Sequence, residues 1–296
     1  MTERLGGTNE PSIPSDGLEI TFGSPDQWKQ FANRNGLFLE RMENLRSAFN
    51  AVFNRKFTDE HQVDSLIFTS GHIATDDFME ILLLCGNAEW FAAQKLLRSM
   101  FERVVTLKYL HMHPDEAEHY LNYHWITHHK LINSVETTFK AGLVDPAVAA
   151  ETKKNYEQFK DQYKITLCKD CGTMRPGISW TPKDLLTMTR KVGMSDLVVP
   201  CYYLPLQQAH PTVSGMIQRL TVKDGVLVPR ERLEPLESDR TLCAAHTLAL
   251  RVLEVEVEHF KLSPEPAEQA VKDFQDIWSS RKDLHAGQKD PPLPKA

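Results

Sequence analysis

The chain has 296 residues, of which 41% are hydrophobic and 25% charged, a balance typical of globular proteins rather than disordered or fibrous ones. Its 34 basic and 40 acidic residues give a net charge of −6, so no basic surplus indicates a nucleic-acid partner. The odd number of cysteines, five, and the lack of a signal peptide predict a cytoplasmic protein. The apolar runs are far shorter than the roughly 18 residues of a membrane span, so no membrane partner is expected.

Glycine and proline dominate residues 1–24, which are predicted to form a flexible leader. A first helix is expected from Pro25 to about residue 54, because proline is favoured at the first helical position. A second begins near residue 58, is interrupted at Gly71, and ends at the Gly86-Asn87 pair. Six more helices are then expected, at about 88–113, 114–140, 146–165, 181–192, 237–262 and 264–281.

The segment from 195 to 210 is expected to be a further helix, bent at Pro205. Residues 167–180 are predicted as a loop, and only 220–229 alternates like a strand, with Asp224-Gly225 as a hairpin turn. The tail 282–296 is rich in proline and is expected to be disordered. These patterns predict an all-α fold: one bundle-like domain over 25–281, with seven to ten helices.

The helix from 88 to 113 is apolar on nearly every side of a helical wheel, as in a helix at the centre of a bundle. Arg98 and Glu102 lie one turn apart on it, among apolar neighbours, and are expected to be buried or to line a cleft. A structural salt bridge and a functional site are both consistent with this spacing. Burying two charges costs several kcal/mol per ion, so the pair is a candidate site.

Two patterns could hold a metal ion. His124 and His128 are spaced to bind one ion from a helix, but they have no evident third ligand. Cys168 and Cys171 are spaced as in a zinc knuckle, yet the other cysteines stand alone and no second pair is in sight. We therefore expect no metal and no cofactor in the isolated chain.

Other catalytic motifs are weak. Helical ribonucleases of the HEPN superfamily carry an arginine followed at a short spacing by a histidine, as in Arg240 to His246 and Arg55 to His61. About two such matches are expected by chance in this composition, so Arg240 and His246 are only a secondary candidate. The sequence has no nucleophile elbow, phosphate-binding loop or dinucleotide-binding fingerprint.

Two runs resemble a known family: LLRSMFERVVTLKYLHMHPDEAEHYLNY at 96–123 and YYLPLQQAHPTVSG at 202–215. They are similar to the bacterial family catalogued as domain of unknown function 5677, over a core of about 76–260. The resemblance implies an all-α fold, no established activity, and a polar set that corresponds here to Arg98, Glu102, Tyr203 and His210. It also implies a distant likeness to HEPN-like proteins of toxin and phage-defence systems.

The chemistry of this set defines two hypotheses. Arg98, oriented by Glu102, would bind a phosphate or carboxylate, His210 would exchange protons, and Tyr203 would be an additional donor. The first hypothesis is a metal-independent nuclease or phosphotransfer-type toxin acting on a nucleotide or RNA anion. The alternative is a non-catalytic ligand-sensing or protein-interaction module. A basic cleft around Arg98 and Arg103 would favour the enzyme, and a homodimer through helices is a further expectation.

Overall fold

The computed structural model describes residues 23–57, 61–139, 142–168, 171–229, 234–281 and 284. The expected leader and tail lie outside the described residues except at Gly23, Ser24 and Leu284. Leu284 is buried, and its carbonyl oxygen accepts a hydrogen bond from Arg240 Nε at 3.1 Å. None of the described helices has the length and hydropathy needed to cross a bilayer.

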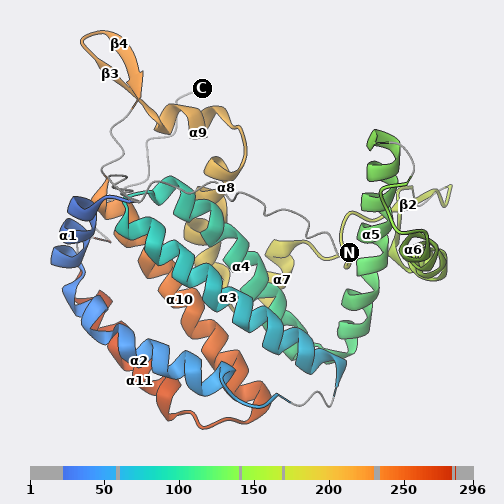
Figure 1. Cartoon of the computed structure of the whole chain (residues 1–296), viewed down its shortest axis with the longest axis horizontal. Coiled ribbons are helices and arrows are strands. Elements are labelled where there is room, and N and C mark those ends of the chain that lie inside the picture. Colours follow the sequence, from blue (N-terminus) through green and yellow to red (C-terminus); the bar gives the residue numbers. More distant parts are fainter. Residues whose placement is uncertain are drawn as a thin grey trace, which may run out of the picture.

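Three long helices form the centre of the molecule: α3 (Gln62–Gly86), α4 (Trp90–Met112) and α10 (Pro235–Phe260), each packed against the other two (Figure 1). The apolar side chains of α4 are sealed from solvent on several sides. Its fully buried residues include Met100, Phe101, Val104, Val105 and Tyr109. The all-round apolarity of this segment therefore correctly predicted the central helix.

Shorter helices cover this centre. α2 (Gly36–Phe53) and α11 (Glu265–Ser279) pack together along one side, and α1 (Pro25–Arg34) lies at one end (Figure 1). On the other side α7 (Leu185–Lys191), a π-helical turn over Val199–Tyr203, and α8 (Leu204–Ala209) pack on α4. α9 (Val213–Gln218) follows α8. The described residues form eleven α-helices, one more than the upper limit that the sequence predicted.

The single helix expected over 25–54 is wrong, because the chain breaks at Asn35. The Asn35 side chain donates hydrogen bonds to the Phe31 carbonyl oxygen at 3.2 Å and to Asp239 Oδ1 at 2.8 Å. Asp239, on α10, is buried and also binds Arg281 Nη2 at 2.8 Å. A buried carboxylate needs such partners, and the break in the helix supplies one of them.

α3, in contrast, is continuous, and the interruption expected at Gly71 is wrong. Gly86 is its last residue, and Ala88 then adopts a left-handed conformation with φ 59°, so that α4 begins at Trp90, two residues later than expected. A short 3₁₀ turn, Pro114–Glu116, connects α4 to the next helix.

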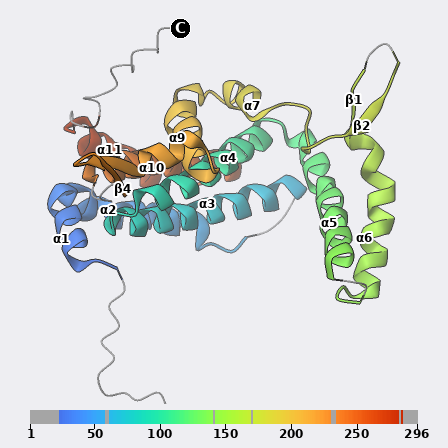
Figure 2. The same cartoon turned by 90° about the horizontal axis from the view of Figure 1, so that it is seen from above.

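An arm projects from the bundle. It consists of α5 (Ala117–Phe139) and α6 (Pro146–Phe159), which pack on each other and stand apart from the central helices in both views (Figures 1 and 2). Beyond α6, strands β1 (Lys164–Thr166) and β2 (Met174–Pro176) form an antiparallel hairpin. β2 lies within the loop predicted at 167–180, but β1 overlaps the end of the helix expected over 146–165, which ends at Phe159 instead. Strands of three residues are too short to show alternation.

The hairpin predicted at 220–229 is confirmed. Strands β3 (Leu220–Lys223) and β4 (Val226–Pro229) pair in antiparallel register. Asp224 and Gly225 connect them with φ values of 52° and 76°. Such a turn needs two positive φ angles, which explains why an Asp-Gly pair stands there.

Candidate functional site

One exposed strip of α4 carries the polar residues of the site. Lys95, Arg98 and Glu102 are three and four residues apart, so they follow one face of the helix. The π-helical turn and α8 pack against α4 in this region. The face that the sequence predicted to be buried or to line a cleft is partly open to solvent.

The turn after α8 brings His210 to this strip. His210 is extended, with φ −116° and ψ 155°, because a residue before proline is disfavoured in the helical region. Thr212 then caps α9 by accepting a hydrogen bond from Gly215 N at 3.0 Å. Gly215 is required here, since a Cβ at this position would lie 2.1 Å from the Gln207 carbonyl oxygen. The QQAHPTVSG run therefore specifies a tight turn that holds His210 in place.

Arg98 joins the two parts of the site. Its Nε donates to Glu102 Oε1 at 2.9 Å, and its Nη1 lies 2.9 Å from His210 Nε2, across 112 residues of sequence. A guanidinium group can only donate, so His210 Nε2 is the acceptor and its proton is on Nδ1. The structure thus brings together three of the four residues that the sequence singled out.

The fourth, Tyr203, has no contact with Arg98 that joins it to this cluster. The Arg98 guanidinium carbon instead lies 5.0 Å from the centre of the Tyr202 ring, a cation–π contact. Tyr203 is exposed and packs on Tyr202 with 5.4 Å between ring centres. Pro205 has no N–H to donate to the preceding turn. That turn is π-helical over Val199–Tyr203, and in this wider geometry Tyr202 is the tyrosine that faces Arg98. The sequence showed two adjacent tyrosines and no signal to choose between them.

The site is open rather than buried. The Arg98 side chain is 19% exposed, that of Glu102 is 43% exposed, and His210 is exposed. The argument that the pair carries a large burial cost therefore does not apply. The site is therefore a partly exposed arginine whose Nε is bound to Glu102 and whose Nη1 contacts His210.

His210 also lines a surface cavity of about 310 Å³, between α4, α8 and α9. Lys95 and Arg219 line the same cavity. Arg219 is held by Gln208 Oε1 at 3.2 Å and by the Phe91 ring, 4.3 Å from its guanidinium carbon. Arg98 adjoins this cavity through its contact with His210, so Lys95 and Arg219 add two cations near His210. The sequence could not show that Lys95 and Arg219 belong to the site, because surface cations are common.

Arg103, expected beside Arg98 in a basic cleft, is elsewhere. Its Nε donates to Asp77 Oδ2 at 3.0 Å, which ties α4 to α3. The basic surface around Arg98 is therefore built from Lys95 and Arg219 instead.

The secondary candidate, Arg240 with His246, is not assembled into one site. His246 is 2% exposed and its Nδ1 accepts a hydrogen bond from Trp278 Nε1 at 3.1 Å. Burial lowers the pKa of His246 to about 4, which keeps the ring neutral. Arg240 instead binds Glu237 Oε1 at 2.6 Å.

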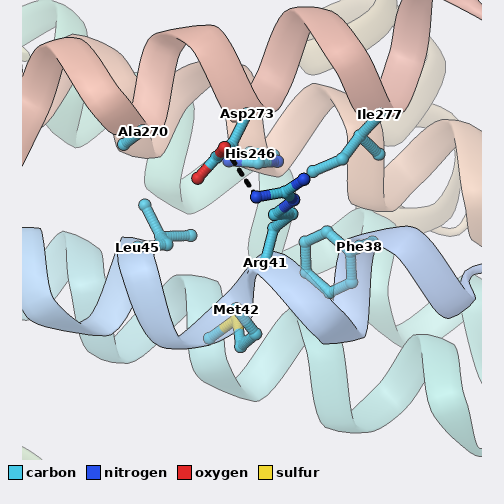
Figure 3. A pocket seen from close by; sticks show the side chains of 8 residues that line it. All are labelled: Phe38, Arg41, Met42, Leu45, His246, Ala270, Asp273 and Ile277. Carbon is cyan, nitrogen blue, oxygen red and sulfur yellow. Dashed lines mark ion pairs between the residues drawn. The ribbon is translucent and has the colours of Figure 1, made fainter.

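His246 also borders an internal cavity between α2, α10 and α11, together with Arg41 and Asp273 (Figure 3). Arg41 Nη1 and Asp273 Oδ1 are 3.9 Å apart there. The cavity measures about 10 Å³, which is room for one water molecule at most. It is therefore a place to satisfy buried polar groups and is too small for an organic ligand.

The metal candidates have few ligands. The rings of His124 and His128 stack with centres 5.1 Å apart, and His128 Nδ1 is 3.2 Å from Thr152 Oγ1. No cluster of three or more metal-ligating side chains occurs in the part of the chain that the structure describes. Cys168 and Cys171 lie at the tip of the β1–β2 hairpin.

Comparison with known families identifies the chain. The profile of a family of unknown function, DUF5677, matches residues 75–226, just over half of the sequence. The chain belongs to this family. The DUF5677 region contains every residue of the cluster: Lys95, Arg98, Glu102, Tyr202, His210 and Arg219. Searches of curated proteins and of solved structures found no significant match to the chain.

Proposed function

We propose that this DUF5677 protein binds a phosphate-bearing anion at Arg98. The observation that carries the proposal is the arginine held by Glu102 and Tyr202 and joined to the exposed His210, which lines a cavity with Lys95 and Arg219. A preoriented guanidinium loses little freedom on binding and matches two phosphate oxygens at once. The two other cations supply the local positive charge that the acidic chain lacks overall.

His210 extends the proposal to catalysis. Its Nε2 lone pair accepts a hydrogen bond from Arg98 Nη1 at 2.9 Å, so it would be free to take a proton once Arg98 turns to a bound phosphate. In RNA cleavage without a metal, Nε2 would take the proton of a 2′-hydroxyl whose oxygen attacks phosphorus, while the 5′-oxygen leaves and acquires a proton. Arg98 would stabilise the added charge on the phosphoryl oxygens, and the leaving oxygen would take its proton from solvent, since Tyr202 rather than Tyr203 packs on Arg98. Arg240 and His246, spaced as in HEPN ribonucleases, have no part in this chemistry.

A non-catalytic sensor is the second candidate. It uses the same anion site without proton transfer, and the exposed position of His210 supports it equally. The five free cysteines favour a cytoplasmic location. If the protein is a nuclease, RNA cleavage there would give it a toxin or defence role.

Binding of inorganic phosphate and of a short fluorescent single-stranded RNA tests the proposal, with Arg98→Ala and His210→Ala as variants. Arg46→Ala is the matched control, because Arg46 also forms an exposed helical pair, with Glu43 at 3.5 Å. We expect Arg98→Ala to lose binding and Arg46→Ala to retain it. Unchanged binding in Arg98→Ala would refute the anion site.

Cleavage of the same RNA in EDTA distinguishes the two candidates. An enzyme would cleave it, and His210→Ala would bind it but lose cleavage by at least about 100-fold, the usual contribution of a general base. Binding without cleavage, in the wild type as in His210→Ala, would establish the sensor.

A further inference from the structure

The β1–β2 hairpin has the form of a zinc knuckle. Leu167 N donates to the Thr173 carbonyl oxygen at 2.7 Å and closes the hairpin, which places Cys168 and Cys171 on its two sides. Gly172 follows the second cysteine with φ 65°, a left-handed conformation that suits glycine. Two cysteines three positions apart at a hairpin tip are the arrangement in which structural zinc sites present one pair of ligands.

Both thiols are free, and the thiol of Cys171 is accessible to solvent. Cys171 is exposed, and its Sγ lies 2.9 Å from Thr173 Oγ1, while Cys168 is half-buried. The other three cysteines, Cys85, Cys201 and Cys243, are on helices of the bundle and are buried or half-buried.

A structural zinc site needs four ligands, and the described part of one chain brings only these two together. The β1–β2 hairpin follows α6 and projects away from the bundle in Figure 2, so the hairpin of a second molecule can approach it without collision between the bundles. Leu167 and Met174, which flank the knuckle, are 62% and 53% exposed. Exposed apolar side chains beside two potential metal ligands are typical of a surface that another chain covers.

The second half of the site is most simply another copy of the same hairpin. Two-fold symmetry makes each copy offer the same patch, and two knuckles together supply four sulfur ligands in the tetrahedral set that zinc prefers. Four thiolates around Zn²⁺ carry a net charge of −2. Arg175, on β2, belongs to the same hairpin and has no ion-pair partner among the described residues. Two such arginines would offset that charge.

We propose that two copies of this chain share one Zn²⁺, each donating the sulfur atoms of Cys168 and Cys171. Binding releases the thiol protons and forms four Zn–S bonds. The homodimer would thus form through the β1–β2 hairpins rather than through the bundle helices, and this proposal is independent of the anion site.

The full-length chain, stripped of metal with EDTA under reducing conditions, tests this when Zn²⁺ is added back. We expect one Zn²⁺ per two chains, and a mass by light scattering that doubles from 33.8 kDa and reverts with EDTA. Co²⁺ in place of Zn²⁺ should give the visible absorption of a tetrahedral thiolate site. Cys168→Ser/Cys171→Ser should lose both metal and dimer, while Cys243→Ser, the same chemical change on α10, should keep them.

Three outcomes would overturn the proposal. One is zinc bound at one ion per chain in a monomer, since the remaining ligands would then come from the same molecule. Another is metal binding in the double variant equal to that of the wild type. The third is an absence of zinc binding by a reduced wild-type chain whose circular dichroism shows that it is folded.

Discussion

Glu256 of α10 occupies the space beside α3 that a side chain at Gly71 would fill. A Cβ on Gly71 would lie 2.1 Å from Glu256 Oε1 and 3.1 Å from Phe53 Cζ. Glu256 is fully buried, and neither of its carboxyl oxygens has a hydrogen-bond partner among the described residues. The glycine therefore serves the close approach of two central helices rather than a break in one of them.

We expect Gly71→Ala to lower the free energy of unfolding by roughly 1–3 kcal/mol, the cost of overpacking a core. The gain in helix propensity, about 1 kcal/mol, opposes this loss and does not remove it. Urea denaturation of both proteins measures the difference. Gly36→Ala is the control, because no atom lies within 4 Å of its added Cβ. A Gly71→Ala protein as stable as the wild type would contradict the packing argument.

The fold was predictable where the sequence pattern of an element depends only on that element. The all-round apolarity of residues 88–113 predicted the central helix, and Asp224-Gly225 predicted a hairpin, because both signals are local. The helix break at Asn35 involves Asp239, 204 residues away, and the close packing at Gly71 involves Glu256, which is also distant in sequence. No local pattern carries that information, so both predictions failed for the same physical reason.

Glu256 also predicts a pH dependence. Burial raises the pKa of Glu256 from 4.5 to about 8, with a smaller opposing effect from Arg55. A carboxyl with a raised folded-state pKa contributes stability below pH 4.5 that is lost as the pH rises through about 8. Glu256→Gln cannot ionise, so its stability relative to the wild type should increase over this range. Parallel stability curves for the two proteins from pH 5 to 9 would refute the assignment.

His246 should make the stability of the protein depend on pH under acidic conditions. Because burial depresses the pKa of its ring to about 4, the unfolded chain binds a proton more readily than the folded chain between pH 6.5 and 4. The stability contributed by His246 is present above pH 6.5 and is lost as the pH falls through 4. His246→Asn keeps an acceptor for Trp278 and cannot titrate. Its melting temperature, although lower at pH 7, should fall less steeply with acid than that of the wild type.

The exposed thiol of Cys171 should react faster than the thiols of Cys85, Cys201 and Cys243. Hydrogen bonds from the Thr173 hydroxyl, the Thr173 backbone and Cys168 lower the pKa of Cys171 to about 7. Burial raises the pKa of Cys243 to about 12, and those of Cys85 and Cys201 even further. Iodoacetamide at pH 7, followed by peptide mass spectrometry, should modify Cys171 well before those three.

Thr173→Val tests the cause of that reactivity. It removes the hydroxyl, so the alkylation of Cys171 should slow at pH 7 and recover at pH 9, where an ordinary thiol also ionises. Equal rates at pH 7 with and without the hydroxyl would show that Thr173 does not lower the pKa.

The candidate site was predictable only in part. The family resemblance and the polar chemistry selected Arg98, Glu102 and His210, and these three do meet. The role of Tyr202 rather than Tyr203 follows from the π turn before Pro205, and that of Arg219 from the fold of α9 onto α8. Both depend on backbone geometry that residue types alone do not specify.

The openness of the site leads to the last prediction, on Arg98→Ala. A buried ion pair that loses one partner costs about 3–5 kcal/mol, whereas an exposed helical pair contributes roughly 0.3–0.5 kcal/mol. The cation–π contact with Tyr202 adds about 0.5–1 kcal/mol. Since the Glu102 side chain is 43% exposed, we expect Arg98→Ala to lower the free energy of unfolding by only about 1 kcal/mol. Urea denaturation beside Arg46→Ala measures this, and a loss above about 3 kcal/mol would make Arg98 a residue of the packing rather than of a site.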